Sequence, residues 1–393
     1  IVSRFRQREF VMIEIKSNRI ITPDGLFDGY VYIDKGKIDC VTAKRKTADE
    51  KYDFTDLFVS AGFIDIHTHG GGGFPFVNGT KEDVVRGANV HLRHGTTSSV
   101  PTVSAAPFPI MKKAVANIAA AMKDENSKSN ILGAHLEGPY LSAAQCGAQC
   151  PDFITEPIEK DYKGLIEKYG EFISRWTYAP EKDVDGAFCK YLTSHGIIAS
   201  AGHTDARYED MKTAIDNGCN LITHLYSCTS TVTRDHGFRS LGVIESAFLR
   251  DELYVEIIAD GKHLPPELIE MIVKIKGIDK VVAVTDSLEI ADTDIKTGVM
   301  SGTPFMVEDG VCKLKDRSAF AGSIATADKL VRVLVKDCGY DVASAVKTVT
   351  SVPAEILKLD KGELSRGKDA DVIVFDEDIN VKSVFVGGEK VRV

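Results

Sequence analysis

The chain has 393 residues, 44% of them hydrophobic and 27% charged, so it is long enough to bury a large core. Its formal net charge of -9 disfavours nucleic acid and anionic membranes as partners, although a local cluster of donors could still bind a small phosphorylated molecule. No apolar run is long enough to span a bilayer, which excludes a membrane-spanning helix.

The first residues are basic and carry no periodic pattern, whereas Met12 opens a strand pattern. We therefore expect the native chain to start at Met12, after an added segment or a misplaced start codon. No secretory leader is recognisable and the eight cysteines are scattered, which predicts reduced thiols in a cytoplasmic protein. Cys146 and Cys150 have the spacing of half a metal site, but no second pair accompanies them, so we interpret them as structural.

Short alternating strands and turns occupy the chain from Met12 to Val59 and return in three segments after Asp371. This pattern predicts one small β-sandwich domain built from both chain ends, residues 12–60 and 363–393. Between them, residues 61–362, apolar strands alternate with helical stretches, as in a parallel sheet with crossover helices.

About eight candidate strands in this middle region predict an α/β fold with a (β/α)8 TIM barrel, whose catalytic groups sit at the carboxyl ends of the strands. The predicted strands are 63–69, 96–103, 131–137, 173–179, 197–203, 221–225, 255–260 and 281–286. The predicted helices include 81–93, 108–123, 209–217 and 266–274, with late helices at 342–347 and 354–357. A β-hairpin insertion is expected near 303–320, around Asp309-Gly310.

His67 and His69 end the first of these strands. Side chains alternate along a strand, so the two imidazoles are expected on one side of its carboxyl end, where they could bind a divalent metal. Asp65 is assigned to anchoring in the core or a loop. Gly70 to Gly73 lack the Lys-Ser/Thr pair of a phosphate-binding P-loop, so nucleotide binding is not expected.

Further metal-ligand side chains end other predicted strands: Glu137 the third, His203 the fifth, His224 the sixth and Asp286 the eighth. Nitrogen and oxygen ligands around an open coordination position are what a catalytic metal requires. His135 lies two residues before Glu137 and is expected to orient a ligand. For His91, His94 and His195 a structural role is favoured.

These motifs resemble the amidohydrolase superfamily and, within it, the N-acetylglucosamine-6-phosphate deacetylases. The resemblance runs over nearly the whole chain from Met12 and rests on the segments 61–70, 135–139, 201–204, 223–226, 258–263, 284–286 and 362–374. The segment Leu136-Glu137-Gly138-Pro139 distinguishes the deacetylases from other members of the superfamily, because many of those instead bridge two metals with a carboxylated lysine on the fourth strand.

The resemblance implies that Glu137, His203 and His224 hold the principal metal, and that His67 and His69 hold a second ion or complete the site. It implies one or two divalent ions per chain, with zinc as the expected metal and iron as the alternative. It also implies a homodimer. Asp286 would be the general base and acid, because it is placed to take a proton from metal-bound water and pass it to the leaving amine. His263 would stabilise the oxyanion, unless it is a loop histidine at the surface.

The resemblance also supplies substrate-binding residues: Ala148, Gln149, Ser227, Cys228, Arg234, His263, Ala321 and Gly322. Two positions depart from the family pattern. Gln149 stands where the family has a histidine, and Ser227-Cys228 replace Asn-Ala. Arg234, with His236 and Arg239 behind it, is the candidate for binding phosphate, often across a dimer interface in the family, but an exposed loop arginine fits equally well.

The predicted function is therefore removal of the acetyl group from N-acetylglucosamine-6-phosphate. The alternative is another amidohydrolase reaction: hydrolysis of a different N-acyl amino sugar, opening of a cyclic amide, or deamination. Glu137, and the absence of a lysine ligand signal at Arg175-Trp176-Thr177, argue against the last two. A scaffold that has lost catalysis is a third hypothesis, disfavoured because no ligand is missing.

Overall fold

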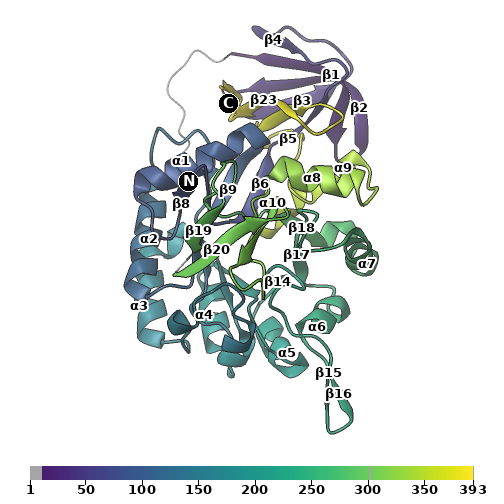
Figure 1. Cartoon of the computed structure of the whole chain (residues 1–393). Helices are drawn as coiled ribbons and strands as arrows, with labels where there is room; N and C mark the ends of the chain where they lie inside the picture. The colour runs from purple at the N-terminus through teal and green to yellow at the C-terminus, as the bar shows by residue number, and fades with distance from the viewer. Residues whose placement is uncertain (1–10, 301, 393) are drawn as a thin grey trace.

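A computed structural model describes residues 11–300 and 302–392. It divides into a parallel barrel and a mixed sheet that lies beyond one end of that barrel (Figure 1). The predicted α/β fold with a TIM barrel and a small sheet domain from both chain ends is thus confirmed. Most of the segment before Met12 lies outside the described residues.

The small sheet joins the two ends of the chain. Its order is β24-β23-β22-β5-β1-β2-β3, with β4 paired to β1. The bounds are β1 Ile13–Thr22, β2 Gly25–Asp34, β3 Lys37–Thr42, β4 Glu50–Asp53, β5 Phe58–Ala61, β22 Val372–Phe375, β23 Val381–Val386 and β24 Glu389–Val391. The N-terminal and C-terminal parts meet where β5 runs antiparallel to β22. Alternating side chains such as Ile15, Val31 and Phe385 form the core under this sheet.

Eight strands form the barrel in chain order, and every neighbouring pair is parallel. They are β6 Phe63–Thr68, β9 Thr96–Ser104, β11 Ala134–Glu137, β12 Ile173–Tyr178, β13 Ile198–Ala201, β14 Leu221–Ile222, β17 Tyr254–Ile258 and β18 Val281–Val284, with the short β10 Asn130–Ile131 beside β9. Each predicted strand is present, although several end earlier than expected because their last residues turn into loops.

The barrel closes between its first and last strands, where Thr68 bridges to Ser287. The main-chain N–H of Asp286 donates to the carbonyl of His67 at 2.9 Å, and that of His69 donates to the carbonyl of Ser287 at 2.8 Å. Asp65 adds a side-chain tie, because its carboxylate accepts from the hydroxyl of Thr285 at 2.5 Å. Closure therefore sets the eighth strand's end directly beside the two histidines of the first.

Helices surround the barrel (Figure 1). They are α1 Lys81–Val90, α2 Phe108–Ala121, α3 Glu159–Tyr169, α4 Ala187–Ser194, α5 Tyr208–Asp216, α6 Val243–Leu249, α7 Pro266–Lys276, α8 Ala327–Lys336, α9 Val342–Lys347 and α10 Ser351–Ile356. The apolar side of α8, with Leu330, Val331 and Leu334, packs into the main core, whereas Val352 and Ile356 of α10 pack against Ile64 of the first strand. None of the helices among the described residues is long and apolar enough to cross a membrane.

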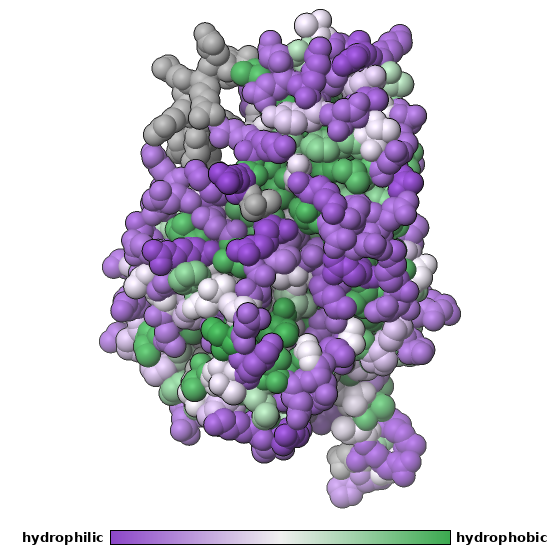
Figure 2. All heavy atoms as spheres, turned by 45° about the horizontal axis from the view of Figure 1, so that its top comes forward, coloured by the Kyte–Doolittle hydropathy of each residue, from purple (hydrophilic) through white to green (hydrophobic). Residues whose placement is uncertain are grey.

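Three small β units lie outside the barrel and the terminal sheet. The hairpin predicted around Asp309-Gly310 is formed by β20 Thr303–Glu308 and β21 Val311–Leu314, and an unpredicted strand, β19 Thr297–Met300, pairs with β20. A second hairpin, β15 Thr233–Asp235 and β16 Phe238–Ser240, projects from the barrel at the lower right of Figures 1 and 2, where its visible surface is mostly hydrophilic. The pair β7 Gly70–Gly71 and β8 Phe74–Pro75 follows the first barrel strand.

A buried ion pair fastens the small sheet to the barrel. The Nζ of Lys361 lies 2.7 Å from Oδ2 of Asp371, with side chains only 8% and 5% exposed, and the same oxygen accepts from Asn130 at 2.9 Å. We predict that Asp371→Asn lowers the free energy of unfolding by about 2 kcal/mol, because the buried ammonium loses its hydrogen-bonded partner and keeps only Asp369, at 3.7 Å and partly exposed, as a countercharge. Denaturant titration measures this. As the control, Glu270→Gln in the exposed pair with Lys274 should cost less than about 0.5 kcal/mol, and equal losses would contradict the prediction.

Candidate metal centre

A cavity of about 270 Å³ lies at the carboxyl ends of the barrel strands. Most of the residues predicted from the sequence line it: His69, Glu137, Ala148, Gln149, His203, His224, Ser227, Cys228, His263, Asp286 and Gly322. Tyr226, Ile258, Met300, Ala319 and Phe320 complete the lining. His67 lies beneath it, with no exposed surface. The cavity is therefore polar on the barrel side, and Met300 of β19 and the residues Ala319 and Phe320 after β21 add apolar side chains.

Glu137, His203 and His224 form one group of possible metal ligands. Oε1 of Glu137 lies 3.2 Å from Nε2 of His203 and 3.1 Å from Nε2 of His224, and the two imidazole nitrogens are 3.1 Å apart. Three ligands at about 2.0–2.1 Å from a tetrahedral ion would be spaced by roughly 3.3 Å. The spacing of these atoms thus fits three ligands of one tetrahedral divalent ion.

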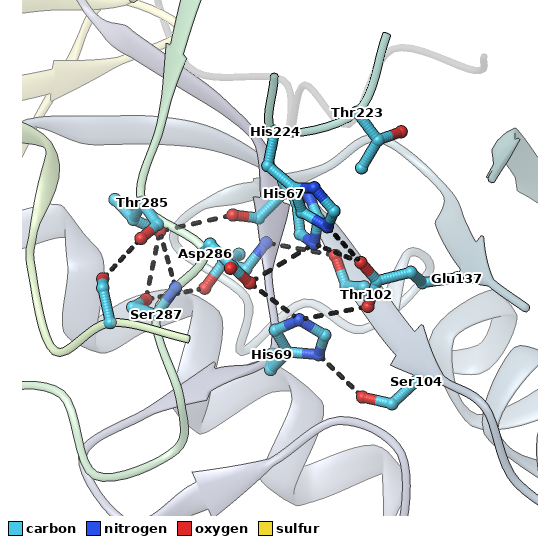
Figure 3. Close-up of polar contacts among 12 residues, drawn as sticks. His67, His69, Thr102, Ser104, Glu137, Thr223, His224, Thr285, Asp286 and Ser287 are labelled. Carbon is cyan, nitrogen blue, oxygen red and sulfur yellow. Dashed lines mark hydrogen bonds and ion pairs between the residues drawn. The ribbon is translucent and has the colours of Figure 1, made fainter. Parts of the chain in front are cut away.

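His67, His69 and Asp286 form a second group. Oδ1 of Asp286 lies 3.0 Å from Nε2 of His69 and 3.4 Å from Nε2 of His67. Glu137 reaches this group too, because its Oε1 lies 3.3 Å from His67 and its Oε2 3.6 Å from His69. Figure 3 shows the labelled imidazoles and Asp286 turned toward Glu137, with His67 and His69 at the end of one strand and His224 and Asp286 at the ends of two others. One carboxylate thus stands between both groups.

The chemistry of these side chains fits a divalent cation. Nε2 of His67 is buried and makes no hydrogen bond among the described residues, although it faces two carboxylate oxygens. Nε2 atoms of His203 and His224 point at each other, where at most one can donate a proton. A cation accepts electron pairs from all these atoms at once, which no arrangement of protons on them does.

Three residues of the cluster have left-handed backbone conformations that side chains rarely adopt: φ is 47° at His203, 31° at His224 and 46° at Asp286. Each such residue costs about 1–3 kcal/mol, and such strain gathers at functional sites. Hydrogen bonds hold the main chain of all three: Asp286 N–H donates to the carbonyl of His67, His224 N–H donates to Oε2 of Glu256, and the carbonyl of His203 accepts from the N–H of Ser142. The left-handed conformations at these strand ends therefore turn the three side chains toward the cluster.

The ionisable groups of the cluster shift one another's pKa strongly in the metal-free protein. Burial opposes charge on all of them, yet Glu137 and Asp286 together raise the pKa of His67 to about 10. Conversely, His67 and His69 lower the pKa of Asp286 to about 2 against burial and the repulsion of Glu137. The pKa of Glu137 falls well below its ordinary value because His67, His203 and His224 surround it. Both carboxylates are thus ionised near neutral pH.

Outward-facing ring nitrogens are fixed by specific partners. Nδ1 of His69 lies 2.9 Å from Oγ of Ser104, and Nδ1 of His203 lies 2.9 Å from the carbonyl of Gln145. His135 hydrogen-bonds the hydroxyls of Thr102 and Thr177 and packs edge-on against His67, with ring centroids 4.6 Å apart. His135 lies beside the ligands, outside both ligand groups.

Gln149 is placed differently from a free sugar-binding amide. Its Nε2 donates to Oε2 of Glu137 at 2.7 Å and its Oε1 accepts from the N–H of Ala105 at 3.0 Å, so the side chain is held in place at 3% exposure. Gly322, with φ of 68°, approaches Asp286 so closely that a Cβ would lie 2.9 Å from the Asp286 carbonyl. Ala321, although buried next to it, does not line the cavity.

His263 and Arg234 have contrasting positions. His263 reaches the cavity; its Nδ1 lies 2.9 Å from Oδ2 of Asp260 and its ring packs edge-on against Phe320. Arg234 does not line the cavity of its own chain. It lies exposed on the β15–β16 hairpin, directly opposite Arg239, so that both side chains share one face.

Two buried charged residues beneath the cluster were missed by the sequence analysis. Glu256 and Arg175 are fully buried, and their side chains pair with each other inside the barrel. Glu256 stands in the otherwise apolar strand Tyr254–Ile258, and Arg175 in Ile173–Tyr178. A charged residue in a buried barrel strand was the available signal, since such groups are almost never buried unless paired.

Comparison with known proteins places these features in a family. The Amidohydrolase family matches residues 58–391. The chain is similar to an N-acetylglucosamine-6-phosphate deacetylase of Lysinibacillus sphaericus, with 30% identity over 337 residues and 86% of each chain covered. It is also similar to an N-acetylgalactosamine-6-phosphate deacetylase of Shewanella sp. (strain ANA-3), with 31% identity over 346 residues that cover 87% of this chain and 86% of the relative. The crystal structure of N-acetylglucosamine-6-phosphate deacetylase from Pasteurella multocida superimposes with a TM-score of 0.90 at 28% identity, covering 97% of this chain and 100% of that one.

The raised pKa of His67 has a measurable consequence. Because His67 holds a proton near neutral pH in the metal-free protein, a divalent ion must displace that proton to use Nε2. We predict that zinc binding near pH 7 releases at least one proton, so that affinity weakens as pH falls, by about tenfold per pH unit for each proton released. Calorimetry in buffers of different ionisation enthalpy counts the protons. A binding heat that is the same in every buffer would contradict this prediction.

Proposed function

The chain belongs to the amidohydrolase family, and from this membership we propose that it is a metal-dependent deacetylase that converts N-acetylglucosamine-6-phosphate into glucosamine-6-phosphate and acetate. The observation that carries the proposal is the convergence of Glu137, His203 and His224 within 3.1–3.2 Å of one another at the floor of a cavity, with Asp286 beside them. The match to this chain covers 86% and 95% of the length of two relatives with this name.

A divalent ion held by Glu137, His203 and His224 would supply a bound water with a pKa of about 7 and polarise the amide carbonyl. Asp286 is ionised near neutral pH, so its free carboxylate oxygen can take the proton of the attacking water. The same group then protonates the leaving nitrogen, which departs as an amine. His67 and His69 either bind a second ion or complete the first site.

His263 is proposed as the residue that stabilises the oxyanion. Its Nδ1 is occupied by Asp260, so Nε2 is the ring atom left to contact the substrate. Ala148, Ser227, Cys228 and Gly322 line the rest of the cavity and would contact the sugar. Gln149 would act chiefly by holding Oε2 of Glu137 in place.

We propose zinc as the native ion, with iron as the alternative, because nitrogen-rich sites with one carboxylate suit both. The cysteines are unpaired throughout the described residues, as a reducing compartment requires, and this supports a cytoplasmic enzyme. A homodimer is proposed because Arg234 stands away from its own cavity on a projecting hairpin, from which it could serve a second copy.

The direct test is turnover after removal of metal by chelation and re-addition of zinc or iron. Acetate release from N-acetylglucosamine-6-phosphate, without ammonia, is expected to disappear on chelation and return with metal. Because one relative is named for the galactosamine epimer, N-acetylgalactosamine-6-phosphate is assayed in parallel as the second candidate substrate. Ammonia release, or activity that survives complete metal removal, would contradict the proposal.

Replacing Asp286 tests the proton transfer. We predict that Asp286→Asn lowers kcat by about a hundredfold or more, which is the scale of positioned acid–base catalysis. The metal content of the variant should stay the same as that of the unchanged protein. The amide still offers an oxygen but cannot accept a proton. Asp292→Asn, on the same loop but outside the cavity lining, is the matched control. Unchanged kcat in Asp286→Asn would refute the assigned role.

Replacing Arg234 tests phosphate binding and the dimer together. We predict that Arg234→Ala raises KM at least about tenfold for the phosphorylated sugar and far less for N-acetylglucosamine, because a guanidinium pairs with phosphate. If Arg234 acts in a second copy, mixing Arg234→Ala with Asp286→Asn chains should restore part of the activity, since one hybrid site is intact. Equal effects on both sugars would remove Arg234 from the phosphate site.

A further inference from the structure

Glu256 is a carboxylate with no exposed surface, set in the middle of an apolar barrel strand. It does not line the cavity and belongs to neither ligand group. Burying a charge is costly unless it is paired and fully hydrogen-bonded, so the barrel must offer Glu256 specific partners. Those partners connect it to the metal centre.

One oxygen of Glu256 is bound by Arg175, which is itself fully buried. Two further hydrogen bonds tie Arg175 to the barrel interior: Nη2 donates to Oγ1 of Thr223 at 3.0 Å, and Nη1 to the carbonyl of Ile66 at 3.3 Å. The planar guanidinium thereby fixes the carboxylate in one orientation.

The other oxygen of Glu256 contacts one member of each ligand group. Oε2 lies 3.2 Å from Nδ1 of His67 and accepts from the main-chain N–H of His224 at 3.1 Å. A hydrogen on Nδ1 of His67 directed at Glu256 leaves Nε2 facing Glu137 and Asp286. The bond to His224 supports a residue whose φ is 31°, and Figure 3 shows the rings of His67 and His224 next to each other.

We propose that Glu256, oriented by Arg175, is the positioning residue of the metal centre: it fixes the ring of His67 from below and the backbone of His224, and so couples the two ligand groups. The proposal rests on the proposed metal-dependent function. A carboxylate behind a metal-binding histidine sets the tautomer and the ring angle, and losing one weakens metal binding by about 10–100-fold. The alternative is that the pair only fills the barrel, in which case it contributes to stability alone.

Metal affinity separates these two roles. In Glu256→Gln the side chain keeps its shape but loses the charge, and competition of zinc with a fluorescent chelator measures the affinity of the folded protein. We expect zinc affinity to fall at least about tenfold. The matched control is Asp371→Asn, which breaks the buried pair with Lys361, whose two residues belong to neither ligand group, and should lower stability while leaving zinc affinity within about twofold. Equal zinc affinity in Glu256→Gln and the unchanged protein would overturn the proposal.

Glu256→Gln leaves Arg175 as an unpaired buried cation, so it could fail to fold. The double variant Arg175→Met/Glu256→Gln removes both charges and keeps their volume, and it carries the test in that case. It too should bind zinc at least about tenfold more weakly, whereas affinity within about twofold of the unchanged protein would overturn the proposal. Failure of the unchanged protein to bind zinc or iron at all would instead contradict the metal-dependent function, so the two failures are distinguishable.

Discussion

The structure depends on negative charge buried at the mouth of the barrel. Glu137 is only 2% exposed, and its two oxygens face the imidazoles of His67, His69, His203 and His224. Because these groups are largely buried, neither the carboxylate nor the crowded ring nitrogens are stable without a compensating charge. The metal-free protein meets this need with protons on histidines, and a divalent cation meets it better because one ion serves every ligand atom.

Bringing these groups together costs backbone strain, and the barrel supplies the means to hold it. His203, His224 and Asp286 all have positive φ at the ends of short strands. Closure between the first and last strands fixes Asp286 against His67, and a carboxylate inside the barrel fixes His224. A loop without such a scaffold would relax, and the ligand atoms would separate.

The periodic features of the chain were predictable. Apolar strands alternating with helical stretches predicted the eight-stranded barrel, and metal-ligand side chains at the ends of those strands predicted the residues that now face one another. The strands β4 and β19 were missed because Glu50–Asp53 and Thr297–Met300 carry little apolar alternation, and their partners define them.

Features that depend on distant pairing were not predictable. Gln149 was expected to contact sugar, but its amide nitrogen donates to Glu137, which lies 12 residues away in the sequence. Glu256 meets Arg175 across 81 residues and His67 across 189, and no local pattern encodes such contacts. Arg234 lies exposed on a hairpin that projects from the barrel and does not line the cavity, so nothing in its local sequence indicates what it contacts.

The meeting of β5 and β22 has a consequence for how the protein is made. Ala61 is paired with Val372, so the edge of β5 and the apolar residues beneath it stay uncovered until almost the entire chain has been synthesised. An exposed strand edge invites pairing with other chains. Newly made molecules whose synthesis pauses before Val372 would therefore expose this strand edge and the apolar residues beneath it.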